Sequence, residues 1–411
     1  MAPAKKKVDA PVAPKGPSAL DRARAFLEKR SEDVYRKESL VQIDEESFRE
    51  SLPHFSSGSI IVDFVIGGKP NRLGVMPCPG FPRGRVIQIY GQASAGKTTL
   101  ALTASASVIR QGGTVCYIDY ENAISIPYAK ALGVPIEDKS KFLLYQPDTI
   151  EEGESILSAM ALSGVDLLVV DSVGEGMFKA ERDNMVNPKE DAKGSGLGSH
   201  ARFWSDKLPG IRGFIGKSGS CLLGISQVRT NIKAASTHGE LHIARGGEAW
   251  KFGSDIRLYL TVKEKEKGKV YDALTHKMLD KTVALTVKVE VKKSRISASQ
   301  GMDADFHIRF GEGIDDIQSV IEVSTAHGII KKGGAWYTWE SSKGEIKGCG
   351  KEGFRAALMA AEGGWEEMRR GVMLKLAEDA SKVQSVVREE EDIPTVESFV
   401  TLDESTVETD A

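Results

Sequence analysis

The sequence predicts an α/β protein with a mostly parallel central sheet, an N-terminal helical arm and a small α/β C-terminal domain. Short apolar runs alternate with helix-like segments through the middle of the 411-residue chain, which is typical of a parallel sheet covered on both faces. A phosphate-binding loop, Gly91-x-x-x-x-Gly96-Lys97-Thr98, lies between one of these runs and a helix-like segment. Apolar residues make up 41% of the chain, which is enough for a large core.

Two segments precede the predicted sheet. Residues 1–17 contain four prolines and four lysines and predict a disordered tail. Residues 18–55 form the predicted arm, because residues 19–41 carry an amphipathic helical pattern. The Gly/Pro-rich stretch GGKPNRLGVMPCPGFPRG then predicts a loop before the first central strand.

Eight strand-like runs build the predicted core domain, residues 56–311. Five are short, apolar and separated by helical segments, so they predict the parallel part of the sheet: 86–90, 114–119, 141–145, 166–171 and 220–226. Three later runs follow one another more closely and predict an antiparallel extension of the same sheet: 256–262, 283–291 and 305–310.

Residues 312–388 predict a small C-terminal domain rich in helices. One helix is expected to begin at Asp315 and end at Gly328, and others to follow Glu352. Residues 389–411 carry nine acidic side chains and no lysine or arginine, which predicts a disordered acidic tail. This tail is either a solvated chain end or an internal competitor for an anionic partner such as nucleic acid.

Composition argues against several other classes of protein. No apolar run approaches the ~20 residues that span a membrane. The first residues lack the apolar core of a signal peptide, so we expect a cytoplasmic protein. The four cysteines form no CxxC pair, which favours reduced thiols over a metal site or disulfides.

The phosphate-binding loop predicts a site for a nucleotide and Mg²⁺. Its glycines allow backbone N–H groups to turn toward phosphate oxygens at the positive end of the following helix. Lys97 is the expected counter-charge to the phosphates, and the Thr98 hydroxyl is the expected Mg²⁺ ligand. The other loop residues in the predicted nucleotide site are Gly91, Gln92, Ala93, Ser94, Ala95, Gly96 and Thr99. A glycine-rich turn without a ligand is the alternative, but such a turn has no need of a Lys-Thr pair.

Polar residues follow the predicted parallel strands, where ligands bind in sheets of this kind. Asp171 ends an apolar run and is the expected Mg²⁺ carboxylate, although a helix N-cap has the same pattern. Glu121 and Asp119 are rival candidates for the carboxylate that activates water for hydrolysis, and either could instead form a salt bridge. Gln227 is expected to sense a γ-phosphate and to pass that signal to the loop after it.

Several longer stretches match one known family. The chain resembles the bacterial RecA recombinase family and related phage-encoded recombinases. The matching stretches recur in the family's order: Gly91–Leu100, Tyr117–Gly133, Gln146–Thr149, Val169–Val173, Ser226–Arg229, Gly246–Arg257, Phe310–Ile314 and Gly334–Tyr337.

The resemblance implies a role for each matched position. Glu121 and Lys97 correspond to catalytic residues, Tyr128 to the aromatic residue that stacks on adenine, and Gln227 to an allosteric glutamine with a part in catalysis.

The resemblance further implies contacts with a neighbouring subunit or with DNA. Lys293 and Arg295 correspond to a catalytic pair that reaches the neighbour's γ-phosphate, Phe252 to an interface aromatic, and six residues to DNA contacts: Arg202, Arg229, Lys233, Arg245, Gly246 and Gly247.

The implied function is that of an ATP-dependent DNA recombinase with ATP and Mg²⁺ as cofactors. Such a protein forms filaments on single-stranded DNA and catalyses homologous pairing and strand exchange, with DNA-stimulated ATP hydrolysis. Implied partners are single-stranded and double-stranded DNA, further copies of the chain bound through the arm at residues 18–55, and single-strand-binding and loading proteins. The setting is a bacterial or phage-infected cell. The alternatives are a ring-forming helicase, a small-molecule phosphotransferase and a mediator in which ATP only sets the shape.

Some positions depart from the family pattern. Ser125 stands where the family usually has an aspartate near adenine, and the loop interior reads Gln-Ala-Ser-Ala instead of Pro-Glu-Ser-Ser. Trp250 and Gly253 interrupt an otherwise well-kept stretch. These departures indicate a divergent member of the family.

Overall fold

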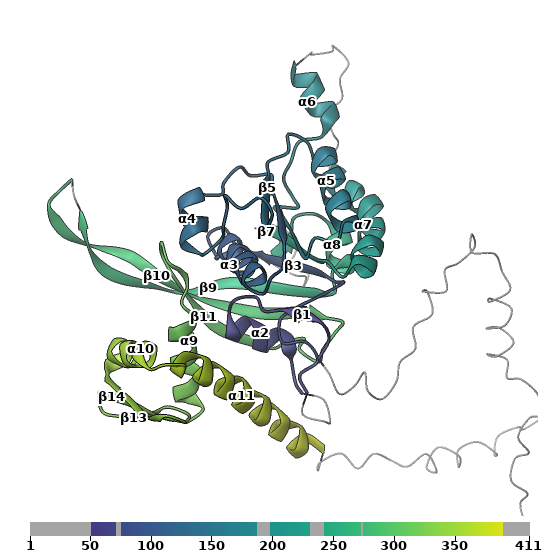
Figure 1. Ribbon diagram of the computed structural model, residues 1–411. Coiled ribbons are helices and arrows are strands. Elements are labelled where there is room, and N and C mark those ends of the chain that lie inside the picture. The colour runs from purple at the N-terminus through teal and green to yellow at the C-terminus, as the bar shows by residue number, and fades with distance from the viewer. Residues whose placement is uncertain (1–50, 71–74, 187–197, 231–241, 273, 389–411) are drawn as a thin grey trace, which may run out of the picture. The chain divides into compact units, whose positions relative to one another are not determined.

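The computed structural model describes residues 51–70, 75–186, 198–230, 242–272 and 274–388 (Figure 1). The predictions for residues 1–17, for nearly all of the arm at 18–55, for Lys233 and for the acidic tail lie outside these ranges. None of the described helices is both long and apolar enough to cross a membrane.

A large mixed sheet forms the core of the described chain. Six of its strands run parallel in the spatial order β5 (Phe142–Tyr145), β4 (Val115–Asp119), β6 (Leu167–Asp171), β7 (Cys221–Thr230), β3 (Val86–Gly91) and β9 (Ile256–Asp272). The sheet continues antiparallel through β10 (Lys277–Ser294), β11 (Asp303–Arg309) and β12 (Gly313–Ile314). The predicted parallel core with an antiparallel extension is therefore confirmed. The run at 256–262 was predicted in the antiparallel part, but it lies in β9, which pairs parallel with β3 and antiparallel with β10.

The parallel strands are buried because helices cover both faces of the sheet. Every residue of β3, β4 and β6 is buried. Alternate side chains enter two separate cores; Ile87 and Ile89 enter one, whereas Val86 enters the other. The first core includes α3 (Lys97–Arg110), and the second includes α5 (Ile150–Leu162) and α7 (Ser199–Ser218). Continuous apolar runs thus predict these strands well.

Shorter elements connect the main ones. These are β1 (His54–Phe55), α2 (Ile60–Gly67), β2 (Phe81–Pro82), α4 (Ile126–Ala131), α6 (Lys179–Val186), β8 (His242–Ala244) and α8 (Glu248–Gly253). The stretch predicted as a loop contains the end of α2 and the short strand β2, which pairs with β1. Strand β8 pairs antiparallel with β7.

The C-terminal part of the described chain combines helices with a small sheet. Its elements are α9 (Asp316–Ala326), β13 (Lys331–Gly333), β14 (Trp336–Ser341), β15 (Gly344–Cys349), α10 (Gly350–Ala360) and α11 (Gly364–Arg388). The predicted helix after Asp315 is confirmed as α9, and the Asp315 carboxylate caps it by accepting a hydrogen bond from the Gln318 N–H at 3.0 Å. The three strands are additional to the predicted helices. They form a separate antiparallel sheet.

Candidate active site

The phosphate-binding loop joins β3 to α3 at the carboxyl edge of the parallel strands. Ser94 and Gly96 have positive φ angles of 59° and 83°. The φ of Gly96 favours glycine, and a Cβ atom there would also lie 2.2 Å from Ile308 Cδ1, so that side chain would have to shift. The Lys97 ammonium donates to the carbonyl oxygens of Gly91 at 3.1 Å and Gln92 at 2.7 Å. Burial lowers the pKa of Lys97, while the nearby carboxylates oppose that shift.

A cavity of about 640 Å³ opens over this loop, within the usual size range of small-molecule sites. Eight residues of the predicted nucleotide site line this cavity: Gln92, Ala93, Ser94, Gly96, Lys97, Thr98, Thr99 and Tyr128. The Tyr128 hydroxyl lies 3.1 Å from Thr99 Oγ1, which joins the candidate adenine-stacking residue to the loop. Gly91 and Ala95 lie in the buried part of the loop instead.

The structure adds cavity residues that the motif does not reveal. Phe310 and Gly311 follow β11, and Lys265, Thr282 and Leu285 come from β9 and β10. Phe310 and Gly311 fall in one of the stretches that match the family. Lys265 had no such signal, because it belongs to a charged run without apolar periodicity.

Thr98 and Asp171 form the candidate Mg²⁺ site. The hydroxyls of Thr98 and Tyr117 each donate to Asp171 Oδ2 at 2.8 Å. Burial raises the pKa of Asp171 to about 6, while these two hydrogen bonds pull it down. A carboxylate beside a hydroxyl fits Mg²⁺, which prefers oxygen ligands and is commonly held by one or two carboxylates together with substrate phosphates.

The geometry separates the two rival carboxylates, Asp119 and Glu121. Asp119 is buried and accepts hydrogen bonds from the N–H groups of Glu121 and Ile124, at 3.1 and 3.2 Å. It also accepts one from Gln146 Nε2 at 3.2 Å. These contacts give Asp119 a structural role in the turn that carries Glu121. Glu121 itself is exposed and is free of such backbone donors among the described residues.

Gln227 lies between the phosphate loop and residues 229–245, which the family resemblance makes the second candidate DNA loop. In the parallel register of β3 and β7, Gln227 lies opposite Gly91. Its Nε2 donates to Glu121 Oε1 at 3.1 Å, and its carbonyl accepts from the Arg245 N–H at 2.8 Å. The same strand then continues to Arg229 and pairs with β8. One strand therefore carries the candidate sensor residue and leads into residues 231–241.

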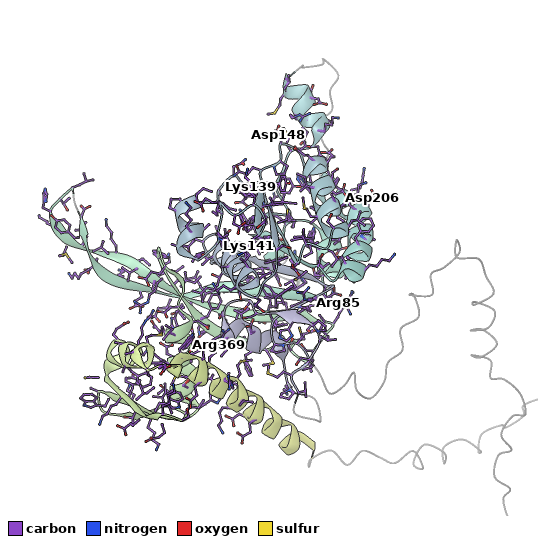
Figure 2. The ribbon with its side chains drawn as sticks, viewed as in Figure 1. Arg85, Lys139, Lys141, Asp148, Asp206 and Arg369 are labelled. Carbon is purple, nitrogen blue, oxygen red and sulfur yellow. The ribbon has the colours of Figure 1, made fainter. Side chains whose placement is uncertain are left out.

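A second cavity of about 710 Å³ lies on the Glu121 side of this strand. Gln227 and Glu121 line it together with Asp148, Glu175 and Glu181. Asp148 lies at the end of the core nearest α6 (Figure 2). The candidate water-activating glutamate thus faces an open, polar space that is also lined by Glu181 of α6.

The candidate DNA residues have different environments. Arg202, in the first turn of α7, and Arg229, on β7, are exposed. Arg245 is half-buried and forms an ion pair with Glu175. A Cβ on Gly247 would lie 2.4 Å from Ala201 Cβ, and one on Gly246 would lie 2.7 Å from Val173 Cγ2. Close packing within the chain therefore explains why glycine occupies positions 246 and 247.

Lys293, Arg295 and Phe252 lie away from the cavity of their own chain. The Lys293 ammonium donates to the carbonyls of Lys251 and Phe252, both at 2.9 Å. Arg295 lies 3.9 Å from Asp255, which accepts a hydrogen bond from the Val86 N–H at the amino end of β3.

The phosphate loop begins at the other end of β3. The strand from Val86 to Gly91 is about 16 Å long at ~3.3 Å per residue. The pair is therefore remote from its own phosphate loop. Burial, then the neighbouring Arg295, lowers the pKa of Lys293 to about 8. Phe252 is 58% exposed beside this pair.

Packing explains part of the unusual sequence near α8. Trp250 is fully buried, in edge-on contact with Trp204 at 5.3 Å between ring centroids. A Cβ on Gly224 would lie 2.2 Å from the Trp250 ring, and one on Gly253 would lie 2.6 Å from Leu208. The bulky tryptophan is thus matched by glycine on β7. Ser125, the other departure, caps α4 by accepting a hydrogen bond from the Tyr128 N–H at 3.4 Å.

Several cations of the C-terminal part have structural partners. Lys351 pairs with Glu322, Arg355 with Asp315, and Lys343 with Glu362. Arg369 of α11 (Figure 2) donates to Ser56 Oγ at 3.3 Å. The exposed Trp336 carries the Lys347 ammonium 5.2 Å above its ring. The small sheet is consequently the part of this region that presents an aromatic ring with lysine to solvent.

A P-loop nucleoside triphosphatase with an extended, mostly parallel sheet is the class that this fold and site define. The family model of the RecA N-terminal domain matches residues 20–315, and the chain belongs to the RecA family. This membership places it among the ATPases of DNA recombination and repair, as the sequence predicted.

Three relatives illustrate the similarity, each called Protein RecA. The one from Borrelia hermsii (strain HS1 / DAH) is 35% identical over 326 residues, which cover 79% of this chain and 82% of the relative. The one from Latilactobacillus sakei is 34% identical over 381 residues, covering 92% and 94%. The one from Thermus thermophilus is 32% identical over 362 residues, covering 88% and 95%.

Among solved structures, a crystal structure of the RadB recombinase aligns with a TM-score of 0.42 and 22% identity. The alignment covers 63% of this chain and 98% of that one.

Proposed function

We propose that this protein is an ATP-dependent recombinase that forms filaments on single-stranded DNA and catalyses homologous pairing and strand exchange. The position of Gln227 is the observation that supports this proposal most strongly. It lies opposite the first residue of the phosphate loop, it bonds to Glu121, and its strand leads into the second candidate DNA loop. A single strand thereby connects nucleotide chemistry with DNA binding.

The proposed hydrolysis assigns one task to each group in the site. Lys97 and the loop N–H groups bind the phosphates of ATP, and Tyr128 stacks on its base. Thr98 and Asp171 hold Mg²⁺, which neutralises phosphate charge when bound. Glu121 accepts the proton of the attacking water. Hydrolysis produces ADP and phosphate, and loss of the γ-phosphate changes the contacts of Gln227.

The neighbouring subunit completes this site in the proposal. Lys293 and Arg295 are too far from their own phosphate loop to serve it, and they lie beside the exposed ring of Phe252. Two cations on an outer surface suit a neighbour's γ-phosphate, where positive charge stabilises the transition state. A filament places each copy's pair against the next copy's nucleotide.

DNA contact in the proposal is largely independent of sequence. Arg202 and Arg229 are exposed cations that suit phosphate oxygens, as a protein that accepts any sequence requires. Lys233, Gly246 and Gly247 belong to the same proposed surface. The Lys347–Trp336 sheet of the C-terminal part is a candidate guide for duplex DNA. Single-strand-binding and loading proteins are further proposed partners, in the cytoplasm of a bacterial or phage-infected cell.

Homologous pairing tests this function directly. The purified protein is mixed with ATP, Mg²⁺, a labelled single strand and a duplex that is either homologous or unrelated. We expect joint molecules only with the homologous duplex and only with ATP. Unwinding of a forked duplex without any homology-dependent product would replace the proposal with a ring-forming helicase.

A further inference from the structure

Strands β9 and β10 continue well beyond the rest of the sheet. The pairing of β9 with β3 ends at Leu260, and the pairing of β10 with β11 begins at Ala284. Past these points the two strands pair only with each other, out to Asp272 and Lys277, as far as the described residues show. Figure 1 shows this two-stranded part extending from the sheet. We call residues 263–282 the hairpin arm.

The outer end of the hairpin arm carries exposed apolar side chains. Leu274 is 92% exposed, Tyr271 58% and Met278 54%. Tyr271 and Met278 are cross-strand partners and therefore share one face of the ribbon. A two-stranded ribbon is marginally stable alone in water, and clustered exposed apolar groups mark interaction sites. The end of the hairpin arm is thus suited to a partner.

The charges of the hairpin arm favour a protein partner over nucleic acid. Six lysines are interleaved with four acidic residues in this segment. Two of the lysines are paired within the arm, Lys269 with Asp280 and Lys281 with Asp272, and Lys263 is paired with Asp305 of β11. DNA binding is strongest where unpaired positive charge is concentrated, whereas the lysines here alternate with acidic residues and exceed them by only two, six against four. Mixed charge around an apolar centre is the pattern of a protein interface.

The position of the base of the hairpin arm indicates which protein binds to the arm. Lys265 and Thr282 line the nucleotide cavity, so the hairpin arm rises from the rim of that cavity. Lys293 and Arg295 lie at the amino end of β3, away from the cavity. If a neighbouring copy places its own Lys293 and Arg295 at this cavity, that copy lies against the rim from which the hairpin arm extends. We propose that the hairpin arm packs on the neighbouring copy of this chain through Tyr271, Leu274 and Met278.

This inference rests on the proposed function, because it requires assembly around the nucleotide. The test compares the wild type with the double variant Leu274→Asp/Met278→Asp. Leu162→Asp serves as the matched control, since Leu162 is 63% exposed at the end of α5. Binding of a fluorescent ATP analogue shows that each protein is folded. Sedimentation and electron microscopy with ATP and poly-dT then measure assembly.

We expect the double variant to bind the analogue normally but to need at least about tenfold more protein for assembly, whereas the control matches the wild type. Equal assembly of all three proteins would overturn the inference and leave the proposed function standing. A wild type that binds the analogue but never assembles would overturn both.

Photo-crosslinking identifies the occupant. Benzoylphenylalanine incorporated at position 274 should give an ATP-dependent crosslink to a second copy of the chain. A crosslink to poly-dT, or none to protein in assembled samples, would overturn the assignment.

Discussion

Gln227 Nε2 donates a hydrogen bond to Glu121 Oε1 at 3.1 Å, which joins β7 to the turn after β4 across the intervening strand β6. The Gln227 carbonyl also accepts a hydrogen bond from the Arg245 N–H. The candidate water-activating carboxylate is therefore two hydrogen bonds from the base of the second candidate DNA loop. The proposed coupling between nucleotide and DNA therefore has a short physical route, through the side chain and the backbone of Gln227.

Replacing Gln227 should uncouple the two sites. In Gln227→Ala the carboxamide bond to Glu121 is lost, while the phosphate loop and Asp171 stay intact. We expect ATP binding to persist and stimulation of hydrolysis by single-stranded DNA to fall by roughly 5- to 150-fold, the usual range of coupling between sites. Gln111→Ala, at the end of α3, is the control. Normal DNA stimulation in Gln227→Ala would remove Gln227 from the coupling route.

Asp171→Asn should be inactive but more stable than the wild type at pH 8. Burial raises the pKa of Asp171 to about 6, so the folded protein holds that proton more tightly than the unfolded chain does. The stability that the neutral carboxyl contributes is complete below about pH 4 and is lost as pH rises through about 6. Asparagine cannot ionise and still accepts hydrogen bonds from Thr98 and Tyr117.

Urea unfolding without Mg²⁺ measures this effect. The gain of Asp171→Asn in free energy of unfolding should be about 1–3 kcal/mol at pH 8 and should shrink toward zero near pH 4. Asp206→Asn, on the exposed surface of α7, is the comparison. A gain that is the same at both pH values would show that ionisation of Asp171 is not its cause.

Arg295 should act on the neighbouring subunit's nucleotide. Arg295→Ala alone is expected to bind ATP but to lose at least about 100-fold in hydrolysis, because a transition-state cation is missing. Lys97→Ala lacks its own phosphate counter-charge but keeps Arg295. In an equal mixture, roughly a quarter of the subunit contacts combine an intact loop with an intact arginine.

Activity should therefore reappear when the two inactive variants are mixed with poly-dT. Steady-state phosphate release measures the recovery. A mixture as inactive as its components would mean that Arg295 serves its own subunit's fold, through Asp255, and not a neighbour's nucleotide.

Deleting residues 389–411 should strengthen binding of duplex DNA. The deletion removes nine negative charges from a segment outside the described residues. We expect the affinity to rise severalfold at low salt and the difference to shrink as salt screens the charges. Fluorescence anisotropy across a salt series measures it, with an uncharged tail of equal length as control. Equal affinities at every salt concentration would identify the tail as a solvated chain end.

Much of the core could be predicted because its signals are local. Residues 86–90 and 166–171 are continuous apolar runs, and the structure has buried strands at both. The helix after Asp315 follows from a side chain that caps it. In contrast, residues 263–269 read KEKEKGK, a pattern with no apolar face, so the extension of β9 could not be recognised as a strand.

The less predictable parts of the site depend on contacts between distant residues. Nothing near Asp119 in sequence shows that its carboxylate is used up by the N–H groups of Glu121 and Ile124. The register that sets Gln227 opposite Gly91 joins strands 136 residues apart, as the two residue numbers show. Likewise, the ion pair of Arg245 with Glu175 links two loops that sequence treats separately. Residue types predicted the kind of chemistry, whereas tertiary packing determines that Asp119 is buried and that Glu121 is exposed.

Steady-state ATP hydrolysis with and without poly-dT, for the wild type and for Glu121→Gln, tests the central claim most directly. Electron microscopy of the same samples records their assembly. We expect strong DNA stimulation in the wild type, a loss of about 100- to 10,000-fold in Glu121→Gln, and extended filaments in both. Turnover that ignores DNA, closed rings alone, or full activity in Glu121→Gln would contradict a DNA-activated recombinase with Glu121 as its base.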